Sequence, residues 1–191
     1  MLLADRGDAE AAAHLDLLVL EHPDSPVVAT AQLRRGELAF DAGDHESALE
    51  PLRAAARAGD PAIRTVALYK LGWSAHVTGR LTEAIDAFLA LWTQPEDTAF
   101  DSSFDLAAEA EELLLRSIAR AGGAPAFAAT FDRNGERERA PRLLAGLSAL
   151  LPDYALDDQA ARADRLHLDR YPDSEGALDA ARRWVRARAR T

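Results

Sequence analysis

The chain repeats a short pattern of small and large apolar residues at an offset of 36 residues. Gly36 and Gly43 align with Gly72 and Gly79 at this offset. Four further pairs follow in register: Ala48 with Ala84, Leu49 with Ile85, Leu52 with Phe88, and Ala55 with Leu91. Self-similarity at a period of roughly 20 to 50 residues is typical of repeat architectures, in which each unit buries its apolar face against the next. The pattern therefore predicts stacked copies of one supersecondary unit.

Each copy contains the spacing of two antiparallel helices. In the second copy, large apolar residues recur at three- and four-residue intervals and form one seam: Leu68, Leu71, Ile85, Phe88 and Leu91. Gly72 and Ala84 are small, which allows the two helices to cross closely. Gly79 can end the first helix in a left-handed conformation because it has no Cβ atom.

The rest of the chain carries weaker copies of the same pattern. Alanine supplies 42 of the 191 residues, whereas only 11 glycines and 9 prolines are present, and this composition favours helix. We expect about ten helices and an all-α fold. A helix is expected to start at Gly7-Asp8 and run to Glu21. Later helices are expected over residues 104–120, 125–132, 142–151, 156–170 and 174–190.

The copy at residues 68–91 resembles the tetratricopeptide repeat (TPR), a helix–turn–helix of about 34 residues in which Gly-x-x-x-x-Ala opens the second helix. The resemblance implies a right-handed α-solenoid of antiparallel helix pairs. It would cover residues 1–191 as a single array, with better repeats at 26–93 and degenerate repeats at 101–191. Residues 94–103 are the least repeat-like join.

The resemblance also implies a protein-interaction scaffold that binds a peptide or partner domain in its concave groove. The sequence contains no catalytic motif, so no enzymatic activity is expected. The implied groove residues are Glu37, Phe40 and Asp41 in the first repeat and Tyr69, Lys70, Trp73 and His76 in the second. An exposed Trp73 would be a plausible anchor for a peptide. The alternative is that Trp73 and Tyr69 pack between repeats as core.

Two linkers precede helices in a similar way. His22-Pro23-Asp24-Ser25-Pro26 and Tyr171-Pro172-Asp173-Ser174 each place Asp and Ser where they could cap the next helix. These two linker sequences are similar to the linkers of bacterial cell-envelope TPR proteins, namely the outer-membrane assembly lipoprotein and the Tol–Pal-associated type. The compartment stays open between periplasm and cytoplasm.

Charge and motif content narrow the possible functions. With 22 Lys+Arg against 32 Asp+Glu, the net charge of -10 argues against a nucleic-acid partner. The five arginines from Arg182 to Arg190 are expected to be solvated, so membrane contact is expected only indirectly. There is no cysteine, and the five histidines lack ligand spacing, so neither a metal nor a cofactor is expected. His45 lies in a turn where Asp44 is expected to cap a helix.

Apolar residues at both ends lack obvious covering helices. They are Leu15, Leu18 and Val19 near one end, and Leu178, Trp184 and Val185 near the other. The chain is therefore interpreted as a segment of a longer protein. The alternative function is a self-assembling structural element in which the end helices of different chains join head to tail.

Overall fold

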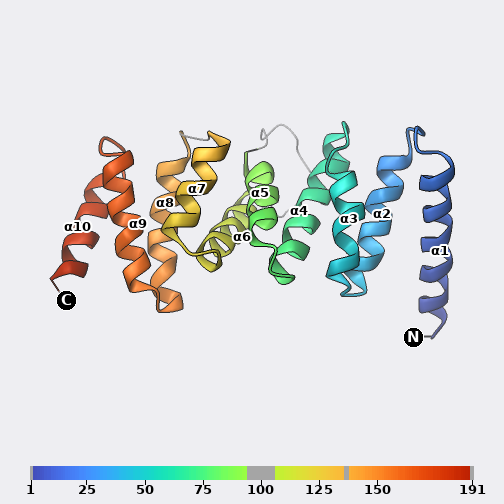
Figure 1. Cartoon of the computed structure of the whole chain (residues 1–191), viewed down its shortest axis with the longest axis horizontal. Helices are drawn as coiled ribbons and strands as arrows, with labels where there is room; N and C mark the ends of the chain where they lie inside the picture. Colours follow the sequence, from blue (N-terminus) through green and yellow to red (C-terminus); the bar gives the residue numbers. More distant parts are fainter. Residues whose placement is uncertain (1, 94–105, 136–137, 190–191) are drawn as a thin grey trace. The chain divides into compact units, whose positions relative to one another are not determined.

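The computed structural model is all-α and describes residues 2–93, 106–135 and 138–189. These residues form ten α-helices, one short 3-10 helix (η1) and no strand (Figure 1). The elements are α1 (Leu2–Glu21), α2 (Val28–Asp41), α3 (His45–Ala55), α4 (Pro61–Val77), α5 (Leu81–Trp92), α6 (Leu106–Arg120), α7 (Ala124–Asn134), α8 (Ala140–Leu150), η1 (Leu151–Tyr154), α9 (Asp157–Arg170) and α10 (Ala177–Arg188). The predicted all-α helical repeat fold is confirmed.

The chain divides into two compact units, which we call unit 1 (residues 1–110) and unit 2 (residues 111–191). Helix α6 begins in unit 1 and ends in unit 2. The predicted join at 94–103 lies outside the described residues. A single continuous array over residues 1–191 stays a prediction.

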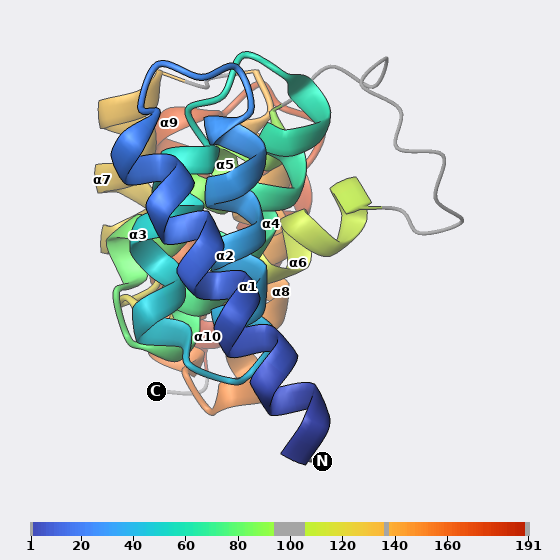
Figure 2. The ribbon, with the colours of Figure 1, turned by 90° about the vertical axis from the view of Figure 1, so that its right-hand side faces the viewer.

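Unit 1 consists of helix pairs stacked in sequence order. Helix α2 packs on α3, and α4 packs on α5. The pairs are joined because α3 and α2 both contact α4. Helix α1 packs on α2, and Figure 2 shows it lying over α2. This arrangement places α2 and α4, the first helices of the two better repeats, next to each other.

Glycine allows the close crossing within each pair of unit 1. A Cβ atom added to Gly36 would lie 2.5 Å from Leu52 Cδ2, and one added to Gly72 would lie 2.6 Å from Phe88 Cε1. Leu52 and Phe88 are fully buried. The predicted role of Gly72 at the crossing is therefore confirmed, and Gly36 has the same role in the first copy.

The turns between the paired helices also follow the sequence prediction. Gly43 and Gly79 have φ angles of 77° and 78°, in the left-handed region that favours glycine. The Asp44 carboxylate accepts a hydrogen bond from the Ser47 backbone N–H and caps α3, as expected. Asp60 caps α4 in the same way, accepting from Ala62 N at 2.8 Å.

Two local predictions are wrong. Helix α1 is continuous from Leu2 to Glu21, so it does not start at Gly7. A glycine inside a helix costs only about 1 kcal/mol relative to alanine, and the neighbouring alanines and leucines favour helix strongly enough to continue through it.

The second error concerns the two Pro-Asp-Ser linkers. Helices α2 and α10 begin after Val27 and Gly176, and neither has a side-chain cap. Each linker forms a backbone turn instead. The Ser25 carbonyl accepts a hydrogen bond from Val28 N, and the Ser174 carbonyl accepts one from Ala177 N, each at 3.0 Å. The turn satisfies these N–H groups without the Asp or Ser side chain, so the helices start later than expected.

Unit 2 contains the end of α6 and the helices from α7 to α10. Helix α8 packs on α9, α9 packs on α10, and α7 contacts both α8 and α9. The apolar part of its core includes fully buried Phe127, Leu143, Leu144, Leu147 and Leu151. Phe127 stacks on Phe131 with ring centroids 4.3 Å apart.

Candidate functional site

The seven predicted partner-binding residues lie on two helices that contact each other, and we call them the α2–α4 face. Helix α2 carries Glu37, Phe40 and Asp41, and α4 carries Tyr69, Lys70, Trp73 and His76. Asp41 is exposed and the other six are half-buried. Side chains of this intermediate burial are held in place by their neighbours and still present surface to solvent.

Lys70 is the centre of this face. Its Nζ atom lies 3.5 Å from Glu37 Oε1 and 3.5 Å from Asp41 Oδ1. The same atom lies 4.9 Å from the centroid of the Phe40 ring, within the range of a cation–π contact. The structure therefore brings four of the seven predicted residues into one cluster, which links α2 to α4.

Two further contacts fix the α2 part of the cluster. Arg34 Nη1 donates to Glu37 Oε2 at 2.8 Å, so the Glu37 carboxylate bridges two cations. The Phe40 ring meets the His45 ring edge-on, with centroids 5.2 Å apart. Glu37 and Phe40 therefore each have a second neighbour besides Lys70.

Tyr69 uses its hydroxyl group for a contact that sequence reasoning missed. Its Oη atom donates to Glu109 Oε1 at 2.7 Å. Burial, followed by the bond to this carboxylate, raises the pKa of Tyr69 to about 12. The phenol therefore stays neutral near pH 7 and acts as a donor. Glu109 lies in unit 1 but follows the region where the repeat register is lost, so no spacing signal identified it.

Trp73 and His76 lie further along α4 and do not join the Lys70 cluster. Trp73 is half-buried, so part of its ring area is covered and part can contact a partner. Its burial is therefore intermediate between the two predicted alternatives, an exposed anchor and a core residue. His76 is also half-buried.

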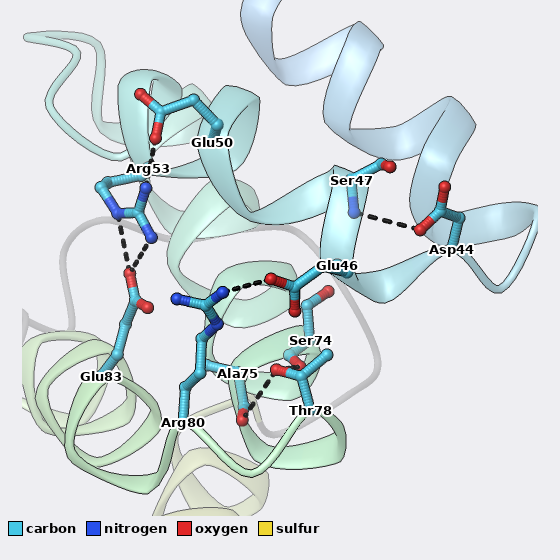
Figure 3. Close-up of polar contacts among 10 residues, drawn as sticks. All are labelled: Asp44, Glu46, Ser47, Glu50, Arg53, Ser74, Ala75, Thr78, Arg80 and Glu83. Carbon is cyan, nitrogen blue, oxygen red and sulfur yellow. Dashed lines mark hydrogen bonds and ion pairs between the residues drawn. The ribbon is translucent and has the colours of Figure 1, made fainter.

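A second set of ion pairs connects α3 to the segment that begins α5 (Figure 3). Arg53 donates through Nε to Glu83 Oε1 at 2.8 Å and also pairs with Glu50. Arg80, just before α5, pairs with Glu46. Sequence reasoning missed both contacts. A weak signal was available only for Glu46 and Arg80, whose separation of 34 positions is near the 36-residue repeat offset.

Unit 2 contains a buried polar cluster that no sequence pattern predicted. The Asp164 carboxylate is 3% exposed and accepts from Ser148 Oγ at 2.7 Å. It also accepts from Arg183 through Nη2 at 2.7 Å and Nε at 3.0 Å. Arg183 was expected to be a solvated side chain and is instead half-buried, because its guanidinium compensates the buried Asp164 charge.

His167 and Ser174 form a second buried contact in unit 2. His167 Nε2 lies 2.7 Å from Ser174 Oγ, and the Ser174 hydroxyl donates to the Tyr171 carbonyl at 2.8 Å. The imidazole Nε2 is therefore the donor, and Nδ1 is buried without a partner among the described residues. An activated serine nucleophile would have to donate to the imidazole, which is the reverse of this arrangement.

Two further findings concern metal sites and membrane-spanning helices. No three His, Asp or Glu side chains within residues 2–93, 106–135 and 138–189 gather where they could hold a metal ion. No helix in that part of the chain combines the length and apolar character needed to cross a membrane.

Comparison with known proteins supports the repeat interpretation. Residues 66–96 match the tetratricopeptide repeat family. They include most of α4 and all of α5, the pair that contains the Gly72–Phe88 crossing. No curated protein matches the chain. The match at residues 66–96, together with the all-α helical repeat fold, supports a relationship of this chain to the tetratricopeptide repeat family.

Proposed function

We propose that this chain is a protein-interaction scaffold that binds a peptide or a partner domain on the α2–α4 face. Tetratricopeptide repeats generally mediate protein–protein interactions, which supports the scaffold role. The observation that carries the choice of this face is the Lys70 cluster, where one cation is held by Glu37, Asp41 and the Phe40 ring.

An ordered cluster of this kind suits binding because little side-chain freedom is lost when a partner docks. The Asp41 side chain is 69% exposed while it contacts Lys70, so it can also pair with a cation from a partner. Trp73 and Tyr69 supply aromatic area beside the charged groups, and aromatic residues are enriched among binding hot spots. The face therefore combines an apolar anchor with charged groups that select the partner.

We place the partner in the bacterial cell envelope. Support comes from the two Pro-Asp-Ser linkers, which are similar to those of envelope TPR proteins and which share the same backbone turn in this structure. A role in envelope assembly would require a partner that occurs in that compartment.

The test is an affinity pull-down with this chain from separated envelope and cytosolic extracts of the source cell. Two variants, Trp73→Ala and Asp41→Ala, change the face, and Glu46→Ala serves as a control on α3. Circular dichroism establishes that each variant keeps its helicity. We expect an envelope protein to be recovered with the parent chain and the control and to be lost with the face variants. Recovery that is equal with all four proteins would contradict this site.

Self-association is a second candidate function, favoured by exposed apolar residues on α1 and α10. On α1, Leu17 and Leu20 are 52% and 77% exposed, and on α10, Leu178 and Val185 are 62% and 59% exposed. Contacts between two different surfaces of this kind generate rings or filaments. Sedimentation velocity over a range of concentrations tests this: assembly that is lost with Leu20→Asp or Leu178→Asp supports it, and a monomer throughout rejects it.

A further inference from the structure

A hollow in unit 2 lies between α9 and α10, and we call it the α9–α10 pocket. Its volume is about 640 Å³. Ligand sites in proteins commonly enclose about 300–1,000 Å³, so the hollow is large enough for a few residues of a peptide. Charged groups line it from both helices: Asp157, Asp158 and Asp164 from α9, and Arg183, Arg186 and Arg188 from α10.

The inner wall of the pocket is built from the buried polar cluster. Asp164 holds the Arg183 guanidinium through the three hydrogen bonds that Arg183 Nε and Nη2 make to the carboxylate. The Arg183 side chain remains 37% exposed, so this fixed guanidinium faces partly toward solvent. Ala161 and Ala187 add small apolar surface between the charged walls.

Apart from the Asp164–Arg183 pair, the two walls carry the exposed charges of Asp157, Asp158 and Arg186, which do not pair with one another. Helices α9 and α10 are antiparallel neighbours, so the first turn of α9 and the last turn of α10 lie at the same end (Figure 1). Asp157 and Asp158 occupy that first turn, and Arg186 lies in that last turn. All three are exposed, and none has a hydrogen-bond or ion-pair partner among the described residues. The hollow keeps them more than ion-pair distance apart.

Each helix stabilises the charges at its own end. Carboxylates are favoured at the N-terminus of a helix and cations at the C-terminus, because of the partial charges on the terminal backbone groups. The separated charges are therefore stable without a ligand. A ligand with one kind of charge would satisfy one wall and be repelled by the other, whereas a ligand with both kinds would satisfy both.

We propose that the α9–α10 pocket binds a peptide segment that carries a basic and an acidic side chain close together. The basic group pairs with Asp157 and Asp158, the acidic group pairs with Arg186, and the residues between them cover Ala161 and Ala187. This site belongs to unit 2 and is independent of the α2–α4 face, so either proposal can fail without the other.

The probes are short peptides, acetylated and amidated at their ends, in which one lysine and one glutamate are separated by one, two or three alanines. Peptides of the same lengths with two lysines or with two glutamates are the like-charge controls. Each is titrated into the ¹⁵N-labelled chain to millimolar concentration and followed by NMR. We expect saturable shifts of α9 and α10 amides with at least one mixed-charge peptide and much smaller shifts with both controls.

Three variants locate the binding. Asp158→Ala and Arg186→Ala each remove one exposed charge from the pocket and should weaken binding by about two- to fivefold, the range for exposed ion pairs. Arg182→Ala is the matched control, because Arg182 pairs with Asp179 on α10 and does not line the pocket. It should leave the affinity unchanged.

Three results would overturn the proposal. The first is the absence of saturable shifts in α9 and α10 with every mixed-charge peptide. The second is equal binding by the like-charge peptides, which would remove the argument from opposite walls. The third is a loss of affinity with Arg182→Ala as large as that with Arg186→Ala. Unchanged amide spectra of the three ligand-free variants, outside the substituted positions, confirm that each of them is folded.

Discussion

Both units have an apolar core and ion pairs between helices, but each also has its own distinctive helix contact. In unit 1, helices cross closely because Gly36 and Gly72 leave room for Leu52 and Phe88. In unit 2, the Asp164 carboxylate joins α9 to α8 and α10 through hydrogen bonds. The glycine crossings depend on the shapes of the side chains, whereas the Asp164 contacts depend on charge.

This difference determines how the stability of each unit responds to a substitution. A glycine crossing needs only one small residue at a fixed position, so the same solution can recur in every copy of a repeat. A buried charge needs particular partners from several helices at once. Overfilling a packed core typically costs about 1–3 kcal/mol, whereas removing one partner of a buried ion pair costs about 3–5 kcal/mol. Unit 2 should therefore be the more sensitive to a single substitution.

The largest expected effect comes from Arg183→Ala. The substitution leaves the buried Asp164 carboxylate with Ser148 alone, so we expect unit 2 to lose about 3 kcal/mol of stability. Hydrogen exchange of α8, α9 and α10 amides measures the loss within unit 2. Arg182→Ala is the control and should stay within about 0.5 kcal/mol of the parent chain.

A double variant separates loss of the pair from loss of side-chain volume. Replacing Asp164 by leucine and Arg183 by methionine removes both charges, and much of the lost protection should return. If Arg183→Ala has no larger effect than Arg182→Ala, the charged cluster does not hold unit 2 together and the contrast between the units disappears.

The next largest effect is expected from Gly72→Ala in unit 1. The added methyl group would lie 2.6 Å from the buried Phe88 ring, so we expect a loss of about 1–3 kcal/mol in urea denaturation. A second substitution, Phe88→Leu, should restore part of the loss by removing the clash.

Gly59→Ala is the matched control in the same unit. Gly59 has open space around its Cβ position and does not adopt a positive φ angle. Alanine there should be neutral or stabilise the protein by about 0.4–1 kcal/mol, because it restricts the unfolded chain. Equal losses at Gly59 and Gly72 would show that backbone freedom, and not the crossing, explains the glycine in the repeat.

Most of the fold of unit 1 could be predicted because its determinants are local or periodic. The glycine crossings recur at the repeat offset, and Asp44 caps the helix that begins with the next residue. The linker caps could not be predicted in the same way. Asp and Ser before a helix predict a cap, but a turn that uses the Ser25 or Ser174 carbonyl delays the helix start.

The candidate site was predictable to a similar extent. Helical periodicity placed Phe40 and Lys70 on the same faces of successive repeats, and the structure brings them into contact. Contacts outside the period were missed. Tyr69 with Glu109, and Asp164 with Arg183, join residues whose separations follow no repeat, so only the three-dimensional packing brings them together.

A pH titration sharpens the comparison because unit 2 contains a buried histidine. Burial, followed by the nearby Arg183 charge, lowers the pKa of His167 below 6.5. The unfolded chain therefore binds a proton at His167 more readily than the folded chain. Its contribution to the stability of unit 2 is complete above pH 6.5 and is lost progressively as the pH falls below that value. The four histidines of unit 1 are exposed or half-buried.

Hydrogen exchange at about pH 7.5 and about pH 5.5 measures this effect, since most carboxylates stay ionised in that interval. Protection of unit 2 should fall relative to unit 1 at the lower pH. His167→Gln should reduce the difference, while His14→Gln, at an exposed position of α1, should leave it intact. A pH dependence that is unchanged in His167→Gln would assign the effect to other groups.

The smallest effect is expected from Glu46→Gln, which removes the ion pair between Glu46 and Arg80. Both side chains are exposed, with fractions of 61% for Glu46 and 48% for Arg80. Exposed pairs contribute about 0.2–1 kcal/mol, and water screens this one, so we expect a loss of at most about 0.5 kcal/mol. A double-mutant cycle with Arg80→Gln, measured by urea denaturation, isolates the coupling. A coupling near 3 kcal/mol would mean that unit 1 also depends on specific charge pairs. The glycine crossings alone would then no longer account for its stability.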